Sequence, residues 1–191
     1  MQELKDRIVK EGKVLPGNII KVDGFLNHRI DTELMDHIAE EFGKHFNMDE
    51  VTMILTAEAS GIALSAIVAH HFHKPMIFAK KAKSDNIEGG LYQSDILSYT
   101  YKKKVTLLVS KEWLSASDKV LIIDDFMARG EAMRGLCDIV KEAGAELVGI
   151  GVAVEKGFQH GGDRLREAGI PLHSLAIIES ADENGFVFRE E

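Results

Sequence analysis

The chain has 191 residues, 45% of them hydrophobic and 28% charged, with a formal net charge of −8 and a single cysteine. The length suits one domain with a sizeable core, and the acidic balance argues against general binding to nucleic acid or to an anionic membrane. The sequence has no apolar run of about 18 residues that would predict a membrane span and no apolar secretory signal at its N-terminus, and one cysteine excludes an internal disulfide, so we expect a cytoplasmic protein.

The first half of the chain alternates helical and strand patterns. Residues 31–46 carry apolar side chains at steps of four, which is typical of an amphipathic helix capped by one of its first two residues. A short apolar run at 51–55 predicts a buried strand. The nearly all-apolar segment 60–72 then predicts a helix packed on a sheet, and residues 76–79 predict the next strand.

Residues 80–104 interrupt this alternation. The segment holds six lysines, three acids, the pair Gly89-Gly90 and all three tyrosines of the chain. Apolar and polar residues alternate at 97–101, which predicts part of a β-arm. Long connections inside compact domains are often lids or binding loops, so we expect a lid over about residues 82–104 that hinges near the glycine pair. Charge alone would favour a solvated loop.

The second half returns to the alternating pattern. It predicts strands at 105–109, 120–124, 146–155 and 172–178, a helix at 130–144 that ends at Gly144, and a short helix at 161–168. Short apolar strands between helices indicate an α/β domain with a mainly parallel sheet. Ligands bind beyond the carboxyl ends of such strands, so the informative residues directly follow Leu55, Ala79, Ile123 and Val154.

The stretch VLIIDDFMARGEA, residues 120–132, places Asp124 and Asp125 where a buried strand ends. The next helix begins near Gly130, and the free backbone N–H groups and positive dipole of a helix N-terminus suit a phosphate. Carboxylates repel a phosphate, but they accept hydrogen bonds from hydroxyl groups or hold a metal. A sugar phosphate with vicinal hydroxyls matches both features. The P-loop pattern G-x-x-x-x-G-K-[ST] does not occur.

The same stretch resembles the phosphoribosyl-pyrophosphate signature of type I phosphoribosyltransferases. The chain is also similar, over nearly its whole length, to the xanthine-specific members of that family. The segments that carry this similarity are PGNIIKVDGFLNHRID, LTAEASGIAL, IFAKKAKS, IDDFMARGEA and AVEKGFQHGG. The resemblance implies the type I phosphoribosyltransferase fold, a mainly parallel sheet flanked by helices in a single domain of residues 1–191. It further implies a small N-terminal hood (about residues 1–35 plus C-terminal residues) and a flexible lid loop.

The resemblance also implies an activity. The substrates would be xanthine and phosphoribosyl pyrophosphate, and the products would be xanthosine 5'-monophosphate and pyrophosphate in purine salvage. Magnesium would be the cofactor, although its direct ligands are not identified, and the assembly would be a homodimer. No nucleic-acid or membrane partner is expected.

Site residues follow from the resemblance position by position. The 5-phosphate would be held by Ala128, Arg129, Gly130, Glu131 and Ala132. The pyrophosphate would be held by Ala59, Ser60, Lys80 and Lys81, with Gly61 beginning a helix beside them. Catalysis would depend on Asp124 and Asp125, which hold the ribose hydroxyls, and on Glu88 in the lid. Ala128 occupies the place of an aspartate in the hypoxanthine-guanine relatives, so Glu88 would be a substitute general base; the alternative is that a partly ionised xanthine needs no strong base. Xanthine would be held by Ile20, Asn27 and Lys156, with Phe126 or Phe158 against the purine face.

Two other functions remain open on the sequence alone. One is a phosphoribosyltransferase with adenine or hypoxanthine-guanine as its base, and the other is a regulator that senses phosphoribosyl pyrophosphate. Lys156 argues against adenine, because lysine donates where the 6-amino group also donates. The histidines at 70, 71 and 73 fit a solvated helix end better than a metal site, because no carboxylate partner is evident. Cys137 is expected in the core.

Overall fold

The computed structural model describes residues 1–81, 90–98, 103–183 and 185–190. Its centre is a six-stranded sheet in the order β10-β9-β8-β7-β3-β4. All neighbouring strands are parallel except the pair β9–β10, which confirms the predicted α/β class with a mainly parallel sheet. The strands are β3 (Met53–Ala57), β4 (Met76–Ala79), β7 (Lys119–Met127), β8 (Glu146–Lys156), β9 (Leu172–Asp182) and β10 (Gly185–Phe188).

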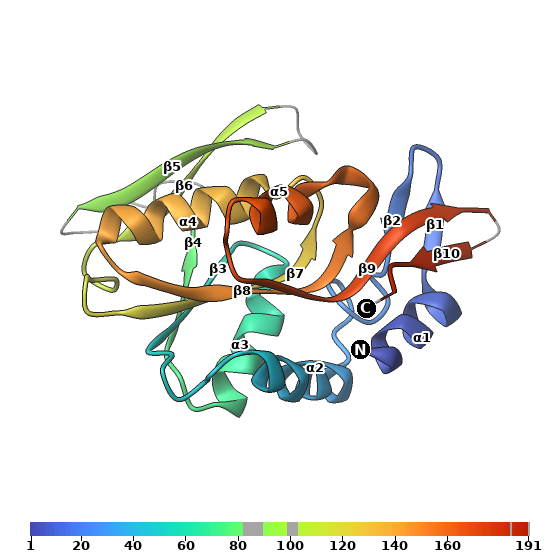
Figure 1. Ribbon diagram of the computed structural model, residues 1–191, viewed down its shortest axis with the longest axis horizontal. Helices are drawn as coiled ribbons and strands as arrows, with labels where there is room; N and C mark the ends of the chain where they lie inside the picture. Colours follow the sequence, from blue (N-terminus) through green and yellow to red (C-terminus); the bar gives the residue numbers. More distant parts are fainter. Residues whose placement is uncertain (82–89, 99–102, 184, 191) are drawn as a thin grey trace.

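Helices cover both faces of this sheet (Figure 1). One face carries α1 (Gln2–Glu11), α2 (Thr32–His45) and α3 (Gly61–His71), and the other carries α4 (Glu131–Ala143) and α5 (Gly161–Glu167), which follows the short 3₁₀-helix η1 (Gly157–Gln159). The helices predicted at 31–46, 60–72, 130–144 and 161–168 are confirmed as α2 to α5. No described helix is long and apolar enough to cross a membrane.

Local sequence explains where α2 begins and where α4 begins and ends. The Asp31 side chain accepts a hydrogen bond from the Leu34 backbone N–H at 3.2 Å, so it caps α2 at its N-terminus. Gly130 and Gly144 flank α4 with φ of 77° and 72°, a left-handed conformation that glycine adopts without steric cost. The predicted stop at Gly144 is therefore confirmed.

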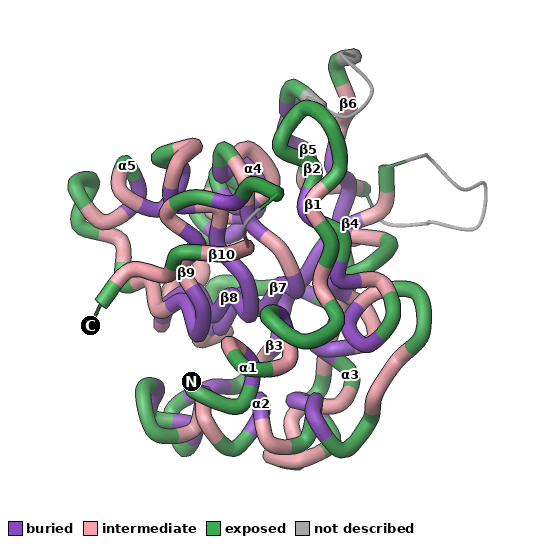
Figure 2. The backbone as a smooth tube through the Cα atoms, turned by 90° about the vertical axis from the view of Figure 1, so that its right-hand side faces the viewer, coloured by how far each residue is buried: buried purple, intermediate pink, exposed green. Residues whose placement is uncertain are grey.

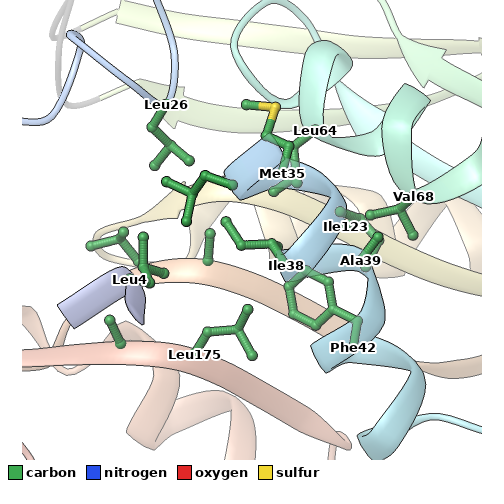
Figure 3. Packing of buried hydrophobic residues seen from close by; sticks show 14 of the residues in the cluster. Leu4, Leu26, Met35, Ile38, Ala39, Phe42, Leu64, Val68, Ile123 and Leu175 are labelled. Carbon is green, nitrogen blue, oxygen red and sulfur yellow. The ribbon is translucent and has the colours of Figure 1, made fainter. Parts of the chain in front are cut away.

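The apolar core has two parts, one on each face of the sheet, and Figure 2 shows the buried strands between them. Under α1, α2 and α3, fully buried side chains such as Leu4, Ile38 and Phe42 pack toward the sheet (Figure 3). On the opposite face the inward residues of α4 pack against strands β7 and β8. Because both faces of the sheet are buried, its strands are nearly continuous apolar runs.

Two further strands, β5 (Leu91–Ser98) and β6 (Lys103–Ser110), form an antiparallel hairpin outside the central sheet. The strand predicted at 105–109 therefore exists but does not join the parallel sheet. The hairpin lies over α4 (Figure 1), where Gly135 lets it approach, because a Cβ there would be 2.5 Å from the Ile96 side chain. Lys80, just after β4, forms an isolated antiparallel bridge with Leu108 of the hairpin.

The N-terminal region adds a small two-stranded sheet of β1 (Lys13–Leu15) and β2 (Ile19–Lys21). Neither these strands nor α1 nor β10 was predicted. The hood and lid boundaries remain predictions, and residues 82–89 of the expected lid, including Glu88, lie outside the described residues, as do residues 99–102.

Candidate active site

A cavity of about 210 Å³ opens at the carboxyl end of β7, where the sequence predicted a ligand site. Its wall comes from the last residues of β7, the following loop, the first turn of α4, and the hairpin above them. The lining residues are Lys81, Ile96, Leu97, Val105, Asp124, Phe126, Met127, Ala128, Arg129, Gly130, Glu131, Ala132 and Met133. The structure thus brings together Asp124, Lys81 and all five residues proposed for the 5-phosphate.

Asp124 and Asp125 lie within β7, which continues to Met127, so the strand extends three residues beyond the predicted end. Both side chains are buried, and the Asp125 backbone N–H donates to Asp124 Oδ1 at 3.0 Å. Burial, and then the neighbouring Asp125 carboxylate, raise the pKa of Asp124 well above its ordinary value. Lys81 acts in the opposite direction, since its positive charge favours the ionised Asp124.

Asp125 joins three separate segments of the chain. Ser60 Oγ donates to its Oδ1 at 2.9 Å, and the Asn27 amide donates to its Oδ2 at 3.0 Å. Both carboxylate oxygens therefore have donors from protein. The sequence predicts that Ser60, Asn27 and Asp125 bind the pyrophosphate, the base and the ribose respectively, and in the structure the first two both contact Asp125.

Gly61, the first residue of α3, lies directly against Asp124. A Cβ at Gly61 would be 2.4 Å from Asp124 Oδ1 and 2.3 Å from Thr56 Oγ1, far inside any real contact. The Thr56 hydroxyl is buried and has no hydrogen-bond partner among the described residues. The absence of a side chain at Gly61 is therefore a requirement of the site, which explains why small residues follow β3.

The two lysines after β4 have different positions. Lys81 lines the cavity, and its backbone N–H donates to Glu58 Oε1 at 2.5 Å, which connects it to the loop before α3. The peptide bond between Glu58 and Ala59 in that loop is cis. Lys80 is not among the residues lining the cavity; its backbone pairs with Leu108 at N–O distances of 2.9 and 2.8 Å.

The residues expected to bind the base are not among those that line the cavity. Lys156 ends β8, and its Nζ donates to the Asn18 carbonyl at 3.4 Å and lies 5.3 Å from the centre of the Phe126 ring. Burial lowers the pKa of Lys156. Phe126 also lines the cavity, so it connects the two subsites. Ile20 is 8% exposed and belongs to the apolar core under the sheet.

The cavity has an apolar roof, formed by Ile96, Leu97 and Val105 of the hairpin, which the sequence did not predict. Gly135 inside the predicted α4 helix was the available signal, since a glycine at that point leaves space for another segment. One partner was also missed: His71 Nδ1 lies 2.7 Å from Asp36 Oδ1. Within the described residues no group of three or more potential ligands converges on a metal, histidines included.

The family model "Phosphoribosyl transferase domain" matches residues 25–179 of this chain. The xanthine phosphoribosyltransferase of Bifidobacterium adolescentis is 51% identical over 98% of this chain and 98% of its own length. The enzyme of the same name from Lachnoclostridium phytofermentans is 53% identical, covering 99% and 98%. The crystal structure of the APRTase from Giardia lamblia, complexed with 9-deazaadenine, superposes with a TM-score of 0.78 over 93% of this chain and 98% of that chain, at 23% identity. This last likeness shows the fold.

Proposed function

The chain belongs to the phosphoribosyl transferase family, and from that premise we propose that it transfers the phosphoribosyl group of phosphoribosyl pyrophosphate to xanthine. A purine nitrogen forms a bond to C1 of the ribose, the bond from C1 to the pyrophosphate oxygen breaks, and xanthosine 5'-monophosphate and pyrophosphate are released. The enzyme is thus a pentosyltransferase of purine salvage. The observation that carries the proposal is the cavity that joins Asp124 to the loop 128–132, beside a base subsite containing Lys156.

The cavity offers suitable groups for both ends of the sugar donor, its 5-phosphate and its pyrophosphate. Backbone N–H groups of residues 128–132, at the N-terminus of α4, suit the 5-phosphate. The buried carboxylates of Asp124 and Asp125 suit the ribose hydroxyls, which donate hydrogen bonds. Lys81 in the cavity wall suits the departing pyrophosphate, whose charge grows as the bond to C1 breaks. Lys80, Ala59 and Ser60, which do not line the cavity, are kept as further pyrophosphate ligands on the resemblance alone.

Xanthine fits the adjoining subsite because it offers carbonyl oxygens and ionises readily. The Lys156 ammonium donates to a carbonyl and stabilises an anionic base, and the Asn27 amide both donates and accepts. Phe126 supplies an aromatic face next to Lys156 for the purine ring. Ile20 is kept as a base contact on the resemblance alone, since its side chain packs in the apolar core. The role of Glu88 as a general base is carried forward from the sequence and lies outside the described residues.

We further propose that the reaction requires magnesium. Asp124 and Asp125 are hard oxygen donors of the type that the ion prefers, and they are too few to hold it without oxygens of the sugar donor. When bound, the ion neutralises charge on the leaving pyrophosphate. Omitting magnesium is expected to abolish pyrophosphate release, and full activity in excess chelator would refute the requirement.

A homodimer in the cytoplasm completes the proposal. Helix α3 has apolar residues on all sides, and Phe78 on the neighbouring edge strand β4 is 38% exposed, as is typical of a face that another chain covers. Light scattering should give twice the mass of one chain, and the Phe78→Asp variant should shift the protein toward monomers. A wild-type monomer at micromolar concentration would refute the dimer, and cell fractionation tests the location.

The decisive experiment measures pyrophosphate release with magnesium and phosphoribosyl pyrophosphate, offering xanthine, hypoxanthine, guanine and adenine separately. Preference for xanthine supports the assignment of Lys156 and Asn27. Preference for another purine would keep the sugar-donor site and overturn the base subsite. If no base is turned over while phosphoribosyl pyrophosphate still raises the melting temperature, the protein is a sensor of the sugar donor.

A further inference from the structure

Glu155, next to Lys156 at the end of β8, is a fully buried carboxylate that the reaction does not use. Arg166 of α5 donates to both of its oxygens, from Nη1 to Oε1 at 3.1 Å and from Nη2 to Oε2 at 2.6 Å. Ser174 of β9 adds a hydrogen bond to Oε2 at 2.5 Å. Glu155 thereby attaches α5 to the two strands beneath it through a bidentate pair, the strongest common form of such contact.

The first turn of α5 is packed between this carboxylate and the cavity. A Cβ at Gly162 would be 2.0 Å from Glu155 Oε1, so the helix backbone rests on the carboxylate itself. One residue earlier, a Cβ at Gly161 would be 2.3 Å from the Ala128 carbonyl oxygen and 2.8 Å from the Gly130 nitrogen. The helix therefore touches Glu155 on one side and the cavity loop on the other.

A hydrogen bond adds to this contact between α5 and the loop. Arg164 Nη2 donates to the Arg129 carbonyl oxygen at 3.0 Å. The Arg129 carbonyl and the Gly130 N–H belong to one planar trans peptide, so holding the carbonyl also fixes the direction of that N–H. The loop depends on α5 for its position, and α5 depends on Glu155.

We propose that the pair Glu155–Arg166 is a positioning device for the phosphate loop. It holds α5 against residues 128–130, so that their backbone N–H groups are fixed before the sugar donor arrives. The effect of this pair on the kinetics rests on the proposed function. Its effect on the order of residues 128–130 does not depend on any reaction. Glu155 and Arg166 are positioning residues and touch neither substrate.

A double variant separates positioning from mere stability. Removing one partner leaves an unpaired buried charge, whereas replacing both by apolar side chains of similar size is commonly tolerated. Glu155→Met with Arg166→Met should fold, since Arg189 still holds Asp163 of α5 at 2.8 Å. The control is Lys119→Met with Glu146→Met, an ion pair with an N–O distance of 3.4 Å between the first residues of β7 and β8, at the end of the sheet away from the cavity.

The first readout is kinetic. In the double variant the KM for phosphoribosyl pyrophosphate should rise about 10-fold or more while kcat changes by less than about 3-fold, because a displaced phosphate loop weakens binding of substrate and transition state alike. Arg166→Lys, which keeps the charge but loses the bidentate geometry, should lie between wild type and the double variant. The control pair should leave both constants unchanged.

The second readout needs no turnover. Amide hydrogen exchange across residues 127–134 should accelerate at least about 10-fold in the double variant and stay at wild-type rates in the control. If the wild type turns over no purine, the proposed function fails and this exchange still decides the inference. A folded double variant with unchanged exchange and unchanged KM overturns it. If the double variant does not fold, Arg166→Lys takes its place, because it keeps the charge beside Glu155 and loses the bidentate contact: faster exchange at 127–134 supports the inference, and unchanged exchange refutes it.

Discussion

The side-chain amide of Asn27 donates to Oδ2 of Asp125 at 3.0 Å, although 98 positions separate the two residues in the chain. Ser60 occupies the other oxygen of the same carboxylate. If Asp125 holds the ribose and Asn27 holds the base, this hydrogen bond directly joins the groups that bind the two substrates. Base binding and sugar-donor binding are then coupled through a single carboxylate.

Asn27→Ala tests this coupling. Asp125 is 1% exposed, so losing a donor to it should destabilise the fold by about 1–3 kcal/mol. The kcat/KM for xanthine should fall about 10- to 100-fold, corresponding to one or two lost hydrogen bonds. Denaturant unfolding and steady-state kinetics measure the two effects. Asn47→Ala, at an exposed asparagine that bonds Glu50, is the control. Wild-type kinetics in Asn27→Ala would remove Asn27 from the base subsite.

Asp125→Asn should impair use of the sugar donor whichever base is supplied. The substitution replaces one acceptor oxygen with an NH₂ group, which cannot accept a hydrogen bond from a ribose hydroxyl or from Ser60. We expect kcat/KM for phosphoribosyl pyrophosphate to fall about 100-fold, measured by pyrophosphate release at saturating base. Equal loss with xanthine and guanine supports a ribose role, and unchanged kinetics would exclude Asp125 from the site.

Lys156→Ala should damage xanthine use selectively. The half-buried Lys156 ammonium contacts the Asn18 carbonyl and the Phe126 ring among the described residues, so it is available to a base with carbonyl groups. Losing a charged hydrogen bond should cost roughly 1.5–3 kcal/mol, or about 10- to 150-fold in kcat/KM for xanthine. The same assay with guanine is the reference. An equal fall for both bases would show that Lys156 does not determine specificity.

Asp124→Asn should stabilise the ligand-free protein, with an effect that depends on pH. The folded state raises the pKa of Asp124 chiefly by burial, so between the ordinary and the raised pKa the folded protein binds a proton that the unfolded chain does not. Stability therefore falls as pH rises through that interval, and the full cost of burying the charge is present only above the raised pKa.

Asparagine carries no charge and avoids this cost. At pH 8 the variant should gain roughly 1 kcal/mol, a shift of about 2–4 °C in Tm for a chain of this size, and the gain should vanish toward pH 4. Thermal melts from pH 4 to pH 8 measure it, with Asp49→Asn on an exposed turn as the control. A gain that is constant with pH, or a loss at pH 8, contradicts the prediction.

Local pattern was sufficient to predict most of the central architecture. Steps of four in 31–46 and a glycine at 144 located α2 and the end of α4, because those signals arise from neighbouring turns of one helix. Helix α1 was missed because only Leu4 and Ile8 of its residues are buried, which is too few for a clear apolar face. The strand at 105–109 was found, but its partner was not, since an apolar run does not specify which strand it joins.

In the candidate site, too, local features were predicted from the sequence and contacts between distant residues were not. Asp124, Gly130 and the loop after β7 were identified from sequence because their chemistry and backbone needs are local. The contacts from Asn27 to Asp125 and from Arg166 to Glu155 are made across the fold, so only the coordinates reveal them. The same reason hid the partner of His71, which lies on another helix.

The arrangement at the margins of the central sheet has a consequence for solubility. An open strand edge can pair with a strand of another molecule. Proteins prevent this pairing with short edge strands, irregular backbone or a segment that covers the edge. β10 is only four residues long, with a register shift between Val187 and Phe188. At the other margin, β4 is equally short, and the antiparallel bridge from Lys80 to Leu108 places the hairpin directly beyond it. Both margins of the sheet are thus protected against edge-to-edge pairing, so the exposed Phe78 on β4 does not lie beside an open strand edge.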